Sequence, residues 1–111
     1  MTTAILFGVR TGTLEEARTC VEKTLSVSLI EREGLHAGGI HFTLGQPRVL
    51  GLKNNIDLDE AEIELNGLSE PDFPRHPFLL YLFDADAVPN ILTALEATPN
   101  LFAKLRTRTN R

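Results

Sequence analysis

The feature that most constrains the fold is an uninterrupted apolar run at residues 78–83. The run Phe-Leu-Leu-Tyr-Leu-Phe has no charged position at which one face of a strand could meet water. A strand of this kind is typically central in its sheet and covered on both faces. Pro77 before the run and Asp84 after it limit it to the length of one strand. The sequence therefore predicts a sheet with an interior strand at about residues 78–84.

The rest of the chain predicts five more strands and two helices. Short or alternating apolar segments bounded by turn residues predict strands at about 4–9, 27–33, 39–45, 48–53 and 101–107. Helical spacing of apolar residues predicts helices at about 13–26 and 87–97. Thr13 and Glu16 have the spacing of a capping box, and Asp86 is placed to cap the second helix. This order predicts an α+β fold with a mixed sheet and two helices, closest to a ferredoxin-like plait with an added strand.

Length and composition indicate one ordinary globular domain over residues 1–111. The chain is too short for two cores of usual size, and 42% hydrophobic with 23% charged residues is a typical globular composition. No apolar run approaches the roughly 20 residues of a membrane span, and residues 1–9 lack the features of a signal peptide. A single cysteine, Cys20, allows no internal disulfide. We therefore expect a cytoplasmic protein that does not contact a membrane.

The residues that most often carry chemistry form no recognised catalytic or metal-binding motif. His36, His41 and His76 lie far apart and lack the spacing that places two imidazoles on one helical face. The turn at residues 8–13 lies between a strand and a helix, but it lacks the lysine of a Walker A loop and the third glycine of a dinucleotide fingerprint. We therefore expect no metal, no cofactor and no catalytic activity. A small enzyme using His41 or His76 with Asp84 is a rival interpretation.

The acidic charge of the chain is concentrated in one segment, residues 57–72. The net charge is -4, yet this segment alone carries -7, while residues 1–56 carry +1 and residues 73–111 carry +2. Apolar residues such as Ile63 and Leu65 are interleaved with the acids, which favours a contact surface over an ordinary solvated loop, the alternative. Such a surface can attract a basic protein, including one whose own site binds nucleic acid. The candidate binding residues are Asp57, Asp59, Glu60, Glu62, Glu64, Glu70 and Asp72.

Three motifs within residues 27–86 resemble those of a known family. They are Gly38-Gly39-Ile40-His41-Phe42, Leu52-Lys53-Asn54-Asn55, and Glu70-Pro71-Asp72-Phe73-Pro74-Arg75-His76-Pro77 leading into the apolar run. A glycine-led aromatic strand, an asparagine at the end of the next strand, and an acidic loop with Phe-Pro before a Leu-Leu strand resemble the small immunity proteins encoded beside bacterial polymorphic and contact-dependent growth inhibition toxins.

The resemblance implies a toxin inhibitor, or antitoxin, without enzymatic activity. Such a protein binds a cognate toxin that acts in the cytoplasm, often a nuclease, and blocks its active site or substrate path. It implies a protein partner and no direct contact with nucleic acid, and it makes the acidic segment the toxin-binding surface. The alternative function is a small-ligand-binding regulatory domain of ferredoxin-like type, in which the turn at residues 8–13 and the neighbouring strand ends hold a metabolite.

Overall fold

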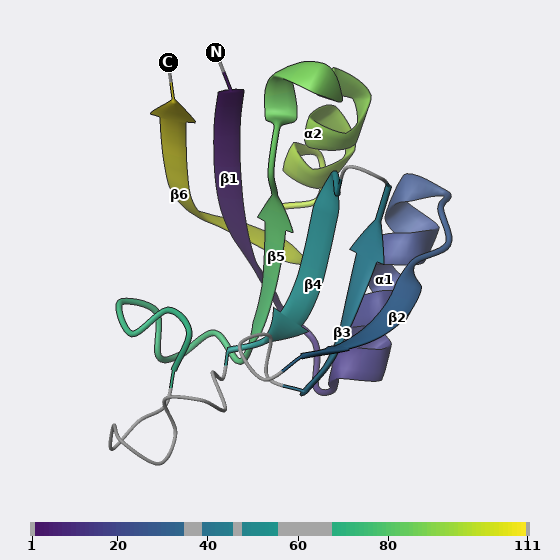
Figure 1. The fold of residues 1–111 in the computed structure, drawn as a ribbon, viewed down its shortest axis with the longest axis vertical. Helices are drawn as coiled ribbons and strands as arrows, with labels where there is room; N and C mark the ends of the chain where they lie inside the picture. The colour runs from purple at the N-terminus through teal and green to yellow at the C-terminus, as the bar shows by residue number, and fades with distance from the viewer. Residues whose placement is uncertain (1, 35–38, 46–47, 56–67, 111) are drawn as a thin grey trace.

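A computed structural model describes residues 2–34, 39–45, 48–55 and 68–110 (Figure 1). Six strands form one sheet in the order β2-β3-β4-β5-β1-β6. The strands are β1 Thr2–Val9, β2 Ile30–Gly34, β3 Gly39–Leu44, β4 Leu50–Asn54, β5 Phe78–Leu82 and β6 Phe102–Asn110. The helices are α1 Leu14–Leu25 and α2 Pro89–Glu96, and a short 3-10 turn, η2 Ala85–Ala87, precedes α2. The α+β class and the expected strands and helices are confirmed, with ends displaced by a few residues.

The predicted interior strand is confirmed. β5 pairs with β4 on one side and with β1 on the other, so both of its edges are hydrogen-bonded within the sheet. Leu79, Leu80 and Leu82 are fully buried. Because Leu79 points to the face opposite Leu80 and Leu82, this strand is covered on both sides, as its apolar sequence requires.

The expected mixed sheet is wrong, because all five pairs of neighbouring strands are antiparallel. The two strand-helix-strand connections do make β1 parallel to β2 and β5 parallel to β6. In neither case are the connected strands neighbours: β1 lies between β5 and β6, and three strands lie between β1 and β2. The sequence pattern indicated the two strand-helix-strand units. It did not indicate that other strands lie between the two strands of each unit in the sheet.

Both helices pack on the same face of the sheet, where the main core lies (Figure 1). Ala17 and Val21 of α1 and Leu95 of α2 are fully buried against apolar residues of the strands. The strand residues of this core include Phe7, Phe42, Leu50, Leu52, Leu80, Leu82 and Phe102. None of the described helices lies on the opposite side of the sheet, which we call the helix-free face. None of the described helices is long and apolar enough to cross a membrane.

The helix ends show one confirmed cap and one wrong prediction. Thr13 caps α1, since its Oγ1 accepts from the backbone N–H of Glu16 at 3.1 Å. Asp86 does not cap α2: Val88 holds the cap position, and Pro89 occupies the first turn. The Asp86 carboxylate instead accepts a hydrogen bond of 2.9 Å from the Thr3 hydroxyl. The proline already fixes the backbone there and has no N–H to satisfy, so this helix starts without a side-chain cap.

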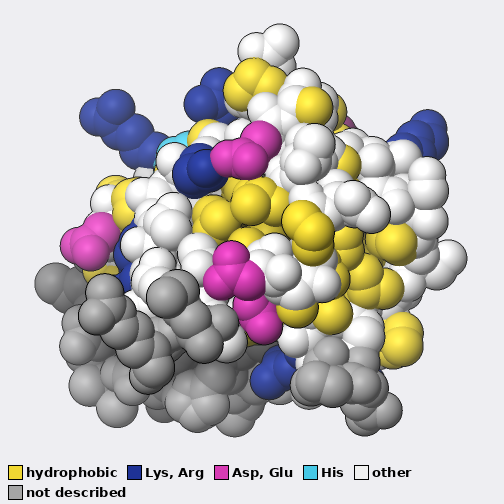
Figure 2. All heavy atoms as spheres, turned by 90° about the horizontal axis from the view of Figure 1, so that it is seen from above, with side chains coloured by type: hydrophobic (Ala, Val, Ile, Leu, Met, Phe, Trp, Pro, Cys, Tyr) yellow, Lys and Arg dark blue, Asp and Glu magenta, His cyan; other side chains and the backbone are white. Residues whose placement is uncertain are grey.

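α2 is short and leaves apolar surface at its end of the molecule. Figure 2 shows this end, which is uppermost in Figure 1, with apolar side chains gathered in the middle of the view and acidic side chains beside them. Val88, Ile91 and Leu92 are half-buried residues that pack on the core from this part of the chain. They complete the core on one side and remain in contact with solvent on the other.

Candidate functional site

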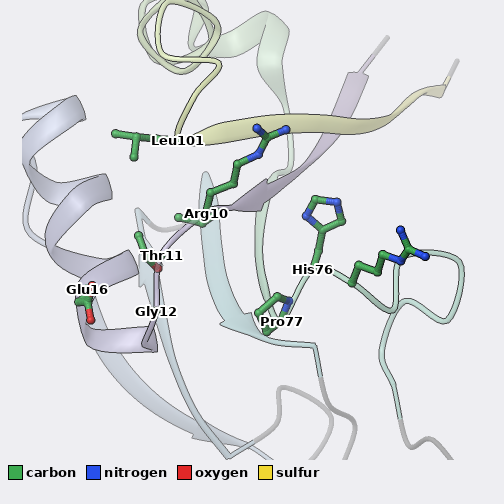
Figure 3. Close-up of a pocket in the computed structure, with 9 residues that line it drawn as sticks. Arg10, Thr11, Gly12, Glu16, His76, Pro77 and Leu101 are labelled. Atoms are coloured by element: carbon green, nitrogen blue, oxygen red, sulfur yellow. The ribbon is translucent and has the colours of Figure 1, made fainter.

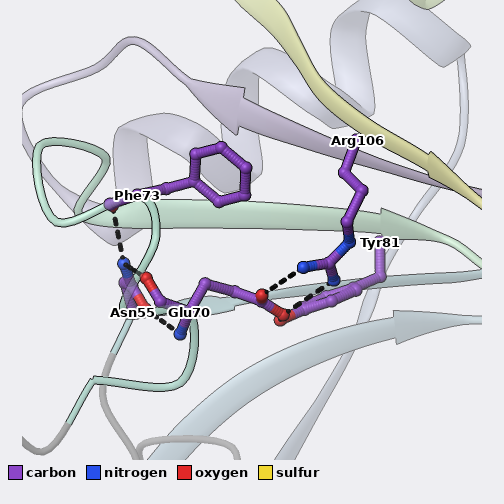
Figure 4. A network of polar contacts seen from close by, with 5 residues as sticks. All are labelled: Asn55, Glu70, Phe73, Tyr81 and Arg106. Carbon is purple, nitrogen blue, oxygen red and sulfur yellow. Dashed lines mark hydrogen bonds and ion pairs between the residues drawn. The ribbon is translucent and has the colours of Figure 1, made fainter.

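A buried asparagine holds the loop that precedes β5. Asn55, which follows β4, is 2% exposed. Its Nδ2 donates to the carbonyl oxygens of Phe73 at 3.0 Å and His76 at 3.1 Å, with a longer contact of 3.4 Å to that of Glu70. Its Oδ1 accepts from the backbone N–H of Glu70 at 2.8 Å, and its own N–H donates to Pro77 O at 2.8 Å. Figure 4 shows the contacts with Glu70 and Phe73. We call this set of bonds the Asn55 clamp.

The side chain of Glu70 continues this network to the far edge of the sheet (Figure 4). The Arg106 guanidinium of β6 donates to both carboxylate oxygens, at 2.7 and 3.1 Å. The Tyr81 hydroxyl of β5 donates to Oε2 at 2.7 Å. The side chains of Glu70 and Arg106 are only 14% and 26% exposed, so this is a largely desolvated, two-pronged ion pair. It ties the loop to two strands that are separated by β1.

The protonation of this network follows from its contacts. Burial alone would raise the pKa of Glu70, but the hydrogen bonds from Arg106 and Tyr81 outweigh burial and lower it. Burial and the bond to the Glu70 carboxylate both raise the pKa of the Tyr81 hydroxyl well above its ordinary value. At neutral pH the carboxylate is therefore charged and the phenol is its hydrogen-bond donor.

The seven predicted binding acids fall into three groups. Asp57, Asp59, Glu60, Glu62 and Glu64 lie outside the described residues. Glu70 is described, and its carboxylate is occupied by Arg106 and Tyr81. Asp72 is exposed in the loop that the clamp holds. Sequence reasoning missed Asn55, Tyr81 and Arg106 as partners of Glu70, and no local pattern joins residues 36 positions apart, as Glu70 and Arg106 are.

A pocket of about 870 Å³ lies where β1 ends and α1 begins. Its lining residues are Val9, Arg10, Thr11, Gly12, Glu16, Arg75, His76, Pro77 and Leu101. In Figure 3 the side chains of Arg10 and His76 extend toward the same space, while Glu16 lies apart at the start of α1. Two arginines and a histidine thus line one hollow beside the turn that the sequence singled out. This arrangement suits an anionic ligand better than a neutral one.

The position of His76 depends on a glycine. The imidazole packs so closely on Gly8 of β1 that a Cβ there would lie 2.3 Å from His76 Nδ1. Only a residue without a side chain allows this approach. The structure therefore gives Gly8 a packing role that the turn motif did not predict.

The other residues considered for chemistry lie apart from one another. His41 is half-buried in β3, and its Nδ1 lies 3.3 Å from Gly39 O. Cys20 is a half-buried free thiol that packs on the core. Asp84 is half-buried between β5 and η2. Within the described ranges, the structure groups no three His, Cys, Asp or Glu residues as metal ligands. His36 lies outside those ranges.

Comparison of the chain with protein-family models, with curated proteins and with solved structures finds no match.

Proposed function

We propose that this chain is an immunity protein that inhibits a basic protein toxin by binding it through the acidic segment, and that it has no catalytic role. The observation that carries the proposal is the Asn55 clamp. Residues 55 and 70 flank five of the acids and are joined by the 2.8 Å bond from the Glu70 N–H to Asn55 Oδ1. A binding loop whose two ends are fixed on a rigid scaffold loses less entropy when it meets its partner.

The chemistry of the proposed partner follows from the charge of the segment. Seven carboxylates between residues 57 and 72, with no basic residue among them, fit a positively charged surface. An active site that binds nucleic acid is such a surface, which supports a nuclease toxin and inhibition by blocking the substrate path. Glu70 is expected to act indirectly, because Arg106 and Tyr81 already occupy its carboxylate. The direct contacts are assigned to the other six acids.

The experiment is co-expression with the protein encoded by the neighbouring upstream reading frame, together with association kinetics of the two purified proteins. The test variant combines D57N, D59N, E60Q, E62Q and E64Q. The control combines E15Q, E16Q, E31Q, E33Q and E96Q, which removes the same charge from exposed acids elsewhere. Wild type should rescue growth, and the test variant should associate about 10-fold or more slowly at low salt. The control should associate within about threefold of wild type, since its acids are not part of the acidic segment.

Two results would overturn the proposal. One is a toxic upstream protein whose effect wild type does not relieve. The other is a test variant that associates as fast as the control, which would show that the segment is an ordinary solvated loop.

The pocket lined by Arg10, Arg75 and His76 favours a second candidate function, the binding of a small anionic ligand by a regulatory domain. The probe is inorganic phosphate, compared with sulfate and chloride at equal ionic strength, and the measurement is the thermal unfolding midpoint. Phosphate should raise the midpoint of wild type but not of a variant combining R10Q and R75Q. K23Q, on an exposed position of α1, is the single-charge control. Equal shifts in wild type and the double variant would exclude this pocket as the site.

We also propose that the sheet is an expanded ferredoxin-like plait. If the β3-β4 hairpin is set aside, the remaining elements follow one another as βαββαβ, and their strand order becomes β2-β5-β1-β6. In this view the hairpin is the addition, inserted between the second strand and the rest of the sheet.

A further inference from the structure

We propose that the helix-free face of the sheet binds single-stranded nucleic acid. The juxtaposition that supports this is the exposed Phe83 ring beside the half-buried Tyr81 ring, with arginines on both sides of the pair, on a face where none of the described helices lies. This surface uses none of the acids assigned to the toxin, so the proposal is independent of the proposed function. It departs from our expectation of no contact with nucleic acid, because only the strand register brings these side chains together.

The aromatic pair consists of Tyr81 and Phe83. Their rings are nearly parallel, with an interplanar angle of 8° and centroids 6.1 Å apart. Phe83, the residue after β5, is 38% exposed, so its ring is accessible to solvent. It lies beside Gly51 of β4, where an added Cβ would be 3.4 Å from the phenyl ring. A flat, exposed ring on a sheet is a surface on which a nucleobase can stack.

The strand register places positive charge on the same face. Arg106 and Arg108 of β6 are paired with Leu6 and Ala4 of β1, and Leu6 is in turn paired with Tyr81. Because directly paired residues share a face, both arginines lie on the side of the aromatic pair. Arg32 of β2 lies on this face as well, and its Nε donates to Thr43 at 3.0 Å. The two carboxylates of the described strands, Glu31 and Glu33, point to the helix side.

Two shallow pockets border the aromatic pair. One, of about 210 Å³, is lined by His41, Thr43, Arg48, Gly51, Leu52, Lys53, Tyr81 and Phe83. The other, of about 230 Å³, is lined by Ala4, Ile5, Leu6, Tyr81, Leu82, Phe83, Arg106 and Arg108. Both pockets include Tyr81 and Phe83, so the rings form a ridge with a cationic hollow on either side. The Arg48 guanidinium lies 5.6 Å from the centroid of the Phe83 ring, where it can also stack on a base.

The positive charge available on the helix-free face favours a nucleic acid over an acidic peptide as the ligand. Arg106 is neutralised by Glu70, and Lys53 already donates to Ser69, so neither is counted as a free cation. Within the described residues, Arg32, Arg48 and Arg108 make no ion pair with a carboxylate. Three available cations beside two rings suit a chain that alternates phosphates with flat bases. An acidic peptide would satisfy the charges and leave the rings unused.

The experiment is fluorescence anisotropy of the full chain with a labelled dodecamer of deoxythymidine and one of uridine. If three phosphates are contacted, the logarithm of the affinity should fall with the logarithm of salt with a slope of about -2. Phe83→Leu should weaken binding by about 5- to 150-fold, the usual effect of losing one base-ring stack. Phe83→Tyr, which keeps the ring, should bind within about threefold of wild type.

A pair of double variants separates specific cations from total charge. R48Q with R108Q should lower the salt slope by about 1.4, because two contacts are lost. K23Q with K104Q, which removes the same charge from the helix side, should leave the slope unchanged. The proposal is overturned if neither oligonucleotide binds, if Phe83→Leu binds like wild type, or if polyglutamate of matched charge displaces the oligonucleotide as well as unlabelled dodecamer does. Circular dichroism of each variant confirms that it is folded before it is compared.

Discussion

Replacement of Asn55 by alanine should strongly destabilise the protein, because its buried side chain makes several hydrogen bonds to the backbone. Three of its side-chain hydrogen bonds are well formed, at 2.8, 3.0 and 3.1 Å, whereas the contact with Glu70 O is long at 3.4 Å and contributes little. A net contribution of about 1 kcal/mol for each good bond gives a loss of about 3 kcal/mol. Loss of the side chain also leaves the carbonyl groups of Phe73 and His76 and the N–H of Glu70 without their partner.

The assay is urea unfolding followed by circular dichroism. With a denaturant slope of about 1–3 kcal/mol/M, the midpoint of Asn55→Ala should fall by about 1–3 M while the slope stays the same. Asn55→Asp should be at least as destabilising, because a carboxylate oxygen then faces the carbonyl oxygens that Nδ2 now binds. The matched control is Asn90→Ala, at an exposed position of α2, which should change the free energy of unfolding by less than about 0.5 kcal/mol.

The reasoning is refuted if Asn55→Ala costs less than about 1 kcal/mol, the value of a single ordinary hydrogen bond. That result would mean that water replaces the amide at no cost and that the loop is held by other contacts. The base of the acidic segment would then not be fixed by Asn55, and the proposed function would lose its main support.

Three further predictions test other parts of the structure. Tyr81 is the only tyrosine, and because burial and the Glu70 carboxylate raise its pKa, tyrosinate absorbance should be missing near pH 10 in the folded protein. The stability that this hydrogen bond provides is then fully present below about pH 10 and is lost as pH rises through the folded pKa, and Glu70→Gln should move the absorbance step toward pH 10. Gly8→Ala should lower the free energy of unfolding by about 1–3 kcal/mol, because its Cβ would lie 2.3 Å from His76 Nδ1. Calorimetry should show that adding His76→Ala removes most of this destabilisation. If the effects of the two substitutions on the free energy of unfolding simply add, the contact is contradicted. Ser26, the residue after α1, has φ 55° and ψ 48°, so Ser26→Gly should raise the unfolding free energy by about 0.5–1 kcal/mol in urea titrations, and a decrease would contradict the assignment of left-handed strain.

Local features of the sequence predicted the elements of the fold well. The apolar run of β5, the alternation in β3 and the spacing of Thr13 and Glu16 each reflect forces between residues close in sequence. The Asp86 cap was wrong because Pro89 offered a second way to start the helix, and Thr3 competed for the carboxylate across 83 positions. A sequence pattern cannot show which of two possible helix starts is formed when a contact with a residue far away in the sequence decides between them.

The candidate sites depended far more on pairing between distant strands. Glu70 was predicted as a contact residue from its place in an acidic run, and the structure binds its side chain to Arg106 and Tyr81. The aromatic pair on the helix-free face looked like ordinary core in the run Phe78 to Phe83. The Phe83 ring lies against Gly51, which is paired with Tyr81 and has no side chain to cover that ring, and only the strand register supplies this information.

The place of β1 in the sheet has a consequence for biosynthesis. Its two hydrogen-bonded neighbours, β5 and β6, come from the last third of the chain. At about 5–20 residues per second, roughly 4–15 s separate synthesis of the first strand from that of β5. During that interval Ile5, Leu6 and Phe7 have no strand to pair with, whereas β2, β3 and β4 can already form their hairpins. A nascent chain of this topology exposes the apolar β1 segment to the ribosome surface and to chaperones until β5 has been synthesised.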